Sequence, residues 1–95
     1  MRWMICSMGN GTCWNGSFEL YVRIEDLLCA LNAGLKQVHG FSGEFFDYYL
    51  VTEQYTEKVQ QTIGDALVLG ELDEEMQYHL AVLLGVFRGG RIIMG

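Results

Sequence analysis

The chain has 95 residues, 51% of them hydrophobic, and twelve acidic residues against six basic ones give a formal net charge of −6. A chain of this length predicts a single domain over residues 1–95. The acidic balance argues against direct binding to nucleic acid and against an anionic membrane surface, because both kinds of binding depend on Lys and Arg.

The cysteines and histidines give no sign of a metal or a cofactor. Three cysteines occur, Cys6, Cys13 and Cys29, and the first residues lack the long apolar segment of a secretion signal. Thiols in a chain without an export signal predict reduced cysteines and a cytoplasmic location. These cysteines, with His39 and His79, form no pair at zinc-site spacing, so we expect no metal and no other cofactor.

The N-terminal segment predicts a β-hairpin. Residues 2–8 are short and apolar, and the segment 9–11 (Gly-Asn-Gly) follows them as a turn signal. Hydrophobic and polar side chains then alternate over residues 17–24, which is the period of a half-buried strand. The glycine-rich loop between these strands would carry Cys13 and Trp14 at its tip.

Helical spacing marks two further segments. Apolar side chains recur every three or four residues over 24–35, and Glu25 and Asp26 occupy the first turn, where the helix dipole favours acids. A later helix is predicted over residues 73–88, with Asp73 as its N-cap and an apolar surface wide enough for a central place in the core or an interface.

Residues 42–67 admit two interpretations. Ser42 is a suitable N-cap, and apolar positions from Phe45 to Leu67 follow a helical period. The competing interpretation makes residues 45–51 a strand, because aromatic residues and valine favour sheets. The continued periodicity favours the helix.

Together these elements predict an α+β fold. An N-terminal antiparallel β-hairpin packs against three helices, and residues 91–94 (Arg-Ile-Ile-Met) are a candidate for a short C-terminal strand that pairs with the hairpin.

No motif predicts catalysis. Cys13 is expected to be exposed, but no neighbouring side chain predicts an activated thiolate, and His79 is expected to be an ordinary histidine. The segment 9–12 (Gly-Asn-Gly-Thr) lacks the lysine of a phosphate-binding loop. We therefore expect no enzymatic activity.

The most informative feature is an acidic run. Residues 44–75 contain nine acids and a single base, Lys58. On a helix over residues 42–67, most of the acids in that range lie opposite the apolar stripe, where they would form an outward negative face that imitates phosphates in a basic groove. The predicted binding acids are Glu44, Asp47, Glu53, Glu57 and Asp65.

Two apolar residues fall near the polar side of that helix. Phe46 and Leu50 are candidate interface anchors, or core residues if the helix is buried on two sides.

On a helix with a rise of about 1.5 Å per residue, the five predicted binding acids would stand about 6–7 Å apart. Duplex DNA carries a charge every ~1.7 Å, so this row could copy a short stretch of phosphates but not a duplex.

In size, acidity and lack of catalytic motif, the chain resembles the small phage-encoded inhibitors of the anti-CRISPR type. Such proteins share no common sequence signature, so the resemblance assigns no individual residue. It implies a cytoplasmic inhibitor in the host cell that occupies the basic DNA-binding surface of a nucleic-acid-processing complex, as a monomer or homodimer. The alternative is a structural or adaptor subunit that self-associates through Leu80, Leu83, Leu84 and Phe87.

Overall fold

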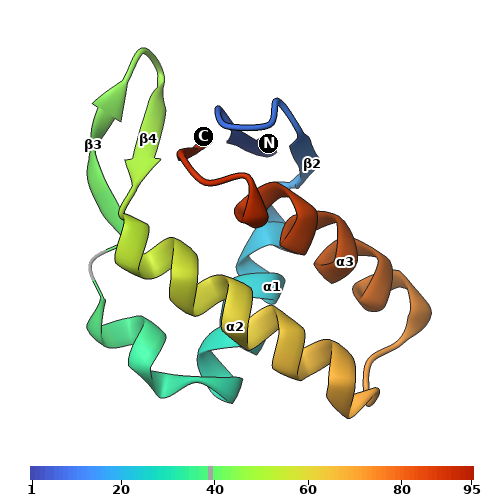
Figure 1. The fold of residues 1–95 in the computed structure, drawn as a ribbon. Coiled ribbons are helices and arrows are strands. Elements are labelled where there is room, and N and C mark those ends of the chain that lie inside the picture. Colours follow the sequence, from blue (N-terminus) through green and yellow to red (C-terminus); the bar gives the residue numbers. More distant parts are fainter. Residues whose placement is uncertain (39) are drawn as a thin grey trace.

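The computed structural model describes residues 1–38 and 40–95, and Figure 1 shows the arrangement of their elements. The strands are β1 (Arg2–Ser7), β2 (Cys13–Ser17), β3 (Phe41–Phe45), β4 (Tyr48–Val51) and β5 (Ile92–Met94). The helices are α1 (Phe18–Leu31), the 3₁₀-helix η1 (Ala33–Gln37), α2 (Glu53–Leu69) and α3 (Glu74–Arg88). His39, considered above as a metal ligand, lies outside the described residues.

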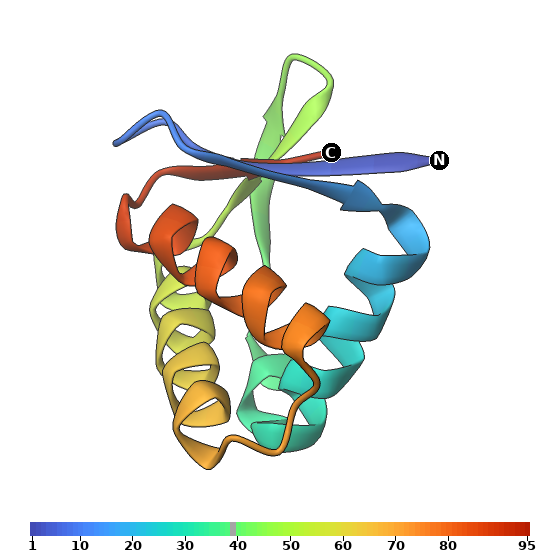
Figure 2. The ribbon, with the colours of Figure 1, turned by 90° about the vertical axis from the view of Figure 1, so that its right-hand side faces the viewer.

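The five strands form one antiparallel sheet in the order β2-β1-β5-β4-β3. The short strand β5 joins two hairpins, since Met94 pairs with Ile5 on β1 and with Tyr49 on β4. The three α-helices lie on one side of the sheet, and the β3–β4 hairpin projects away from them (Figure 2). The predicted α+β fold is confirmed, including the N-terminal hairpin and the C-terminal strand.

The core fills the space between the sheet and the helices. Its most completely buried side chains come from β1, α2, α3 and β5, and they include Ile5, Ile63, Leu80, Leu83, Ile92 and Met94. The predicted final helix is confirmed as α3. The Asp73 carboxylate accepts a hydrogen bond from the Met76 amide at 2.8 Å, which caps the first turn.

The strand predicted over residues 17–24 is wrong, because α1 already begins at Phe18. The Ser17 hydroxyl accepts a hydrogen bond from the Leu20 amide at 3.1 Å and so caps the helix. Strand β2 instead covers Cys13–Ser17, and Trp14 is 2% exposed rather than at a loop tip. The alternation over residues 17–24 was too short to separate a strand from the first turns of an amphipathic helix.

The helix predicted from Ser42 is also wrong in its first ten residues, where the competing strand interpretation holds. Phe45 pairs with Tyr48, so Phe46 and Asp47 form a tight turn, and Phe46 takes a positive φ of 55°. The Thr52 hydroxyl then accepts from the Tyr55 amide at 3.2 Å, which starts α2 at Glu53. From there the predicted helix is confirmed.

Two cysteines are oxidised, contrary to the prediction that all three are free. Cys6 and Cys13 face each other across β1 and β2, with their Cα atoms 4.1 Å apart, and form a disulfide. The register of the hairpin brings them together, which spacing alone did not predict. Cys29 is a free, half-buried thiol.

Candidate functional site

The five predicted acids do not form one row. Glu44 and Asp47 lie on the β3–β4 hairpin, whereas Glu53, Glu57 and Asp65 lie on α2. All five are exposed, as predicted for a binding surface. The continuous helical row over residues 44–65 does not exist, because the chain reverses at Phe46 and Asp47.

The α2 acids do share one face of their helix. At about 100° per residue, Glu53, Glu57 and Asp65 fall within about 120°, opposite the buried Val59 and Ala66. Within the described residues, the single ion pair joins His79 Nε2 to Glu75 Oε1 at 3.9 Å. No described Lys or Arg therefore neutralises the three α2 carboxylates, which leaves the outward face of α2 negative.

The predicted anchors have different surroundings. Phe46 is 81% exposed at the hairpin turn, and its ring packs edge-on against Phe45 with 4.5 Å between ring centroids. Leu50 is half-buried and pairs with Ile93 in the sheet. Phe46 is therefore free to enter a partner, while Leu50 mainly holds the hairpin to β5. We call Glu44, Phe45, Phe46 and Asp47 the hairpin tip.

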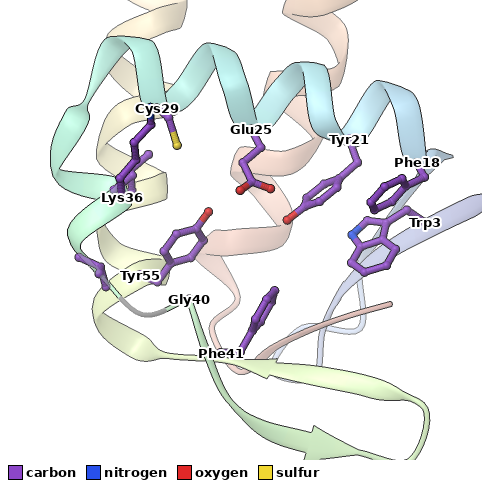
Figure 3. Close-up of a pocket in the computed structure, with 11 residues that line it drawn as sticks. Trp3, Phe18, Tyr21, Glu25, Cys29, Lys36, Gly40, Phe41 and Tyr55 are labelled. Atoms are coloured by element: carbon purple, nitrogen blue, oxygen red, sulfur yellow. The ribbon is translucent and has the colours of Figure 1, made fainter.

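A second candidate site was not foreseen from the sequence: an aromatic cleft of about 380 Å³ between α1, η1, β3 and α2. Figure 3 shows its walls, with Tyr21 and Glu25 on α1 opposite Phe41 on β3. The lining residues also include Trp3, Phe18, Cys29, Lys36 and Tyr55. Its volume falls within the ~300–1,000 Å³ of small-molecule sites.

Aromatic rings support one end of the cleft. The Trp3 ring stacks on Tyr21 at 5.1 Å between centroids and meets the edge of Phe18 at 5.2 Å. Across the cleft, Phe41 packs on Tyr49 at 5.1 Å. These contacts fix the rings before any ligand arrives. Trp3 Nε1 is buried and has no hydrogen-bond partner among the described residues.

Glu25 dominates the electrostatics of the cleft. Burial raises the pKa of Tyr55 to about 12 and raises the pKa of Tyr21 further, and the negative charge of Glu25 adds to both increases. Burial and then Glu25 also raise the pKa of the Cys29 thiol. In Figure 3 the Glu25 carboxylate lies between the two tyrosine hydroxyls. Around neutral pH, all three neighbours are therefore uncharged.

None of Cys13, Cys29 and His79 lies where a neighbouring group would activate it as a nucleophile. The Cys13 sulfur is held in the disulfide, and the raised pKa keeps the Cys29 thiol protonated. Trp14 Nε1 donates a hydrogen bond to His79 Nδ1 at 3.2 Å, so this nitrogen of His79 serves the core rather than a substrate.

The described parts of the chain contain no group of three or more His, Cys, Asp or Glu side chains placed to hold a metal ion. Over the same residues, no helix has the length and apolar character required to cross a bilayer.

Comparisons of the chain with protein-family models, with curated proteins and with solved structures found no match.

One signal for the cleft was present in the sequence. Phe18, Tyr21, Glu25 and Cys29 recur every three or four residues, and in α1 they share one face. Because residues 17–24 were predicted to be a strand, these side chains were not expected to share one helix face. The opposite wall, from β3 and α2, depends on tertiary packing.

Proposed function

We propose that the chain is a non-catalytic inhibitor that binds the basic surface of a nucleic-acid-processing complex and blocks it. The observation that carries this proposal is the projecting hairpin tip. There, Phe46 stands 81% exposed between Glu44 and Asp47, and no described cation pairs with either acid. Aromatic side chains are enriched at the cores of protein interfaces, so an exposed phenylalanine on a projecting turn is a suitable anchor.

The two parts of this surface have separate roles. The outward carboxylates of α2 accelerate the encounter with a Lys- or Arg-lined groove, because electrostatic steering acts mainly on the association rate. Phe46 then fills an apolar pocket and slows dissociation. The contact resembles phosphate recognition over a short stretch only, since the carboxylates are split between the hairpin and α2.

The structure argues less well for a self-associating adaptor. Leu80, Leu83 and Phe87 are at most 3% exposed and fill the core, and Leu84 packs against it. A subunit contact through these residues would require α3 to leave the core. Light scattering over a wide concentration range checks this alternative, and a monomer throughout agrees with the inhibitor proposal.

The test compares binding by four forms of the protein. The wild-type chain, Phe46→Ala, the pair Glu44→Lys and Asp47→Lys, and the control Glu19→Lys are immobilised and exposed to a bacterial lysate. Glu19 is exposed on α1, away from the hairpin tip. Bound proteins are identified by mass spectrometry at low and high salt.

The proposal expects one nucleic-acid-processing complex that the wild type and Glu19→Lys both retain. Phe46→Ala should weaken its binding by about thirtyfold, equivalent to the ~2 kcal/mol of a hot-spot residue. The double charge reversal should abolish retention at low salt. Equal retention of the complex by all four forms would contradict the proposal.

A further inference from the structure

The aromatic cleft lies apart from the hairpin tip, and its chemistry is different. One carboxylate, that of Glu25, faces a space walled by the rings of Tyr21, Phe41 and Tyr55 (Figure 3). Aromatic faces attract cations, best within about 6 Å of the ring centroid, and such rings around a carboxylate are typical of sites for alkylated ammonium groups.

No side chain of the described protein occupies this space as a cation. Lys36 lines the end of the cleft near Cys29, where its positive charge only partly opposes the rise in the pKa of that thiol, and it forms no ion pair with Glu25. Glu25 is half-buried, so its charge is only partly screened by water. The cleft therefore combines a negative charge, preformed aromatic walls and unfilled volume.

We propose that this cleft binds a methylated ammonium group, with Glu25 as the counter-charge and Tyr21, Phe41 and Tyr55 as the aromatic walls. In a quaternary ammonium the charge is surrounded by methyl groups, so water binds it more weakly than it binds a primary ammonium. Less hydration free energy is therefore lost when it enters an aromatic site. The volume of about 380 Å³ suits such a head group with a short chain attached.

Other ligand classes fit the cleft less well. An anion would be repelled by the Glu25 carboxylate, which no described Lys or Arg pairs with. A divalent cation requires about six oxygen ligands, and the described lining offers a single carboxylate. A neutral apolar ligand would bury Glu25 without compensation.

The experiment is a titration of the intact protein followed by NMR of the aromatic resonances. Choline is the charged probe, and 3,3-dimethylbutan-1-ol is its neutral counterpart of the same shape. A peptide carrying trimethyllysine forms a third arm, because a methylated ammonium can belong to a free small molecule or to a modified lysine of a protein. The tighter of the two cationic probes identifies the source.

The charged probes should saturate, with the largest shifts at Tyr21, Phe41 and Tyr55. The neutral alcohol should bind at least about tenfold more weakly, because it lacks the charge on which cation–π attraction depends. Glu25→Gln should also weaken choline binding about tenfold, whereas Glu19→Gln, on the same helix but outside the cleft, should leave it unchanged.

Three results would overturn this proposal. They are the absence of saturable shifts with both cationic probes, equal affinity for choline and the alcohol, and unchanged choline affinity in a folded Glu25→Gln variant. The comparison of charged and neutral probes uses the wild-type protein, so it remains decisive if the variant fails to fold.

Discussion

The hydrogen bond between Trp14 and His79 should contribute measurably to the stability of the fold, because its donor is buried. Trp14 is 2% exposed, and its indole nitrogen donates to His79 Nδ1 at 3.2 Å. The His79 side chain is 17% exposed, so water cannot readily replace it as the acceptor. A buried donor left without a partner destabilises a protein by about 1–3 kcal/mol.

The most informative variants at this position are His79→Asn and His79→Leu, which have nearly the same shape. The Asn side-chain oxygen can take the place of Nδ1, whereas Leu offers no acceptor. We therefore expect the Leu variant to be less stable than the Asn variant by about 1 kcal/mol, although Leu has the higher intrinsic helix propensity. For a domain of this size that difference equals about 4–8 °C in Tm.

The same pair of substitutions at Tyr78 serves as the control. Tyr78 neighbours His79 on α3 but is 66% exposed and reaches no buried donor. At position 78, helix propensity alone should therefore set the relative stability of the two variants, and the Leu variant should be the more stable one. Urea and thermal unfolding, followed by circular dichroism, measure all four variants. If Leu equals or exceeds Asn at both positions, the hydrogen bond does not stabilise the fold as argued.

Three other perturbations follow from the structure. The Cys6–Cys13 disulfide closes a short loop, so a reductant should lower the stability of the wild type by about 2–3 kcal/mol but leave a double serine variant unchanged; equal sensitivity of both would contradict this. Because burial raises the pKa of Tyr55 to about 12, its contribution to stability is present below pH ~10 and is lost as the pH rises towards 12. Phenolate absorbance should show Tyr55 ionising after the exposed tyrosines, and a single titration near pH ~10 would refute the argument. Gly9→Ala should destabilise clearly in thermal melts, since its Cβ would collide with the Gly89 carbonyl, whereas Gly43→Ala has open space and should be nearly neutral.

The sequence predicted the helices with the strongest caps and the longest apolar stripes. Asp73 and the apolar positions of α3 agree with the structure, as does α2 from Glu53 onward. The short strand β5 was also anticipated, because its residues are apolar and follow two glycines. In each case the local signal and the tertiary packing favour the same element.

The two errors in secondary structure occur where a helical and a strand pattern overlap over a few residues. At residues 42–52 the decisive features are the turn at Phe46 and the N-cap at Thr52, and neither is visible in hydrophobic periodicity. At residues 17–24 the Ser17 cap outweighs a brief alternation. Cap and turn chemistry therefore decided both segments.

For the binding surfaces too, the sequence predicted what depends on single residues and missed what depends on turns and packing. The exposure of the five acids agrees with the sequence, because charged side chains are rarely buried. For Phe46 the sequence left an interface anchor and a core residue open, and its 81% exposure at the hairpin turn favours the first. The distribution of the acids over two elements did not agree with the sequence, since it depends on the turn. The aromatic cleft required the packing of β1, α1, β3 and α2, which no local pattern contains.

We propose that this chain occupies a surface of its partner that otherwise holds nucleic acid. The most direct measurement is competition: the partner complex captured by the wild type is titrated with duplex DNA at constant salt. We expect DNA and this protein to displace each other completely, and Phe46→Ala to compete about thirtyfold less well. A stable ternary complex of partner, DNA and this protein would contradict it.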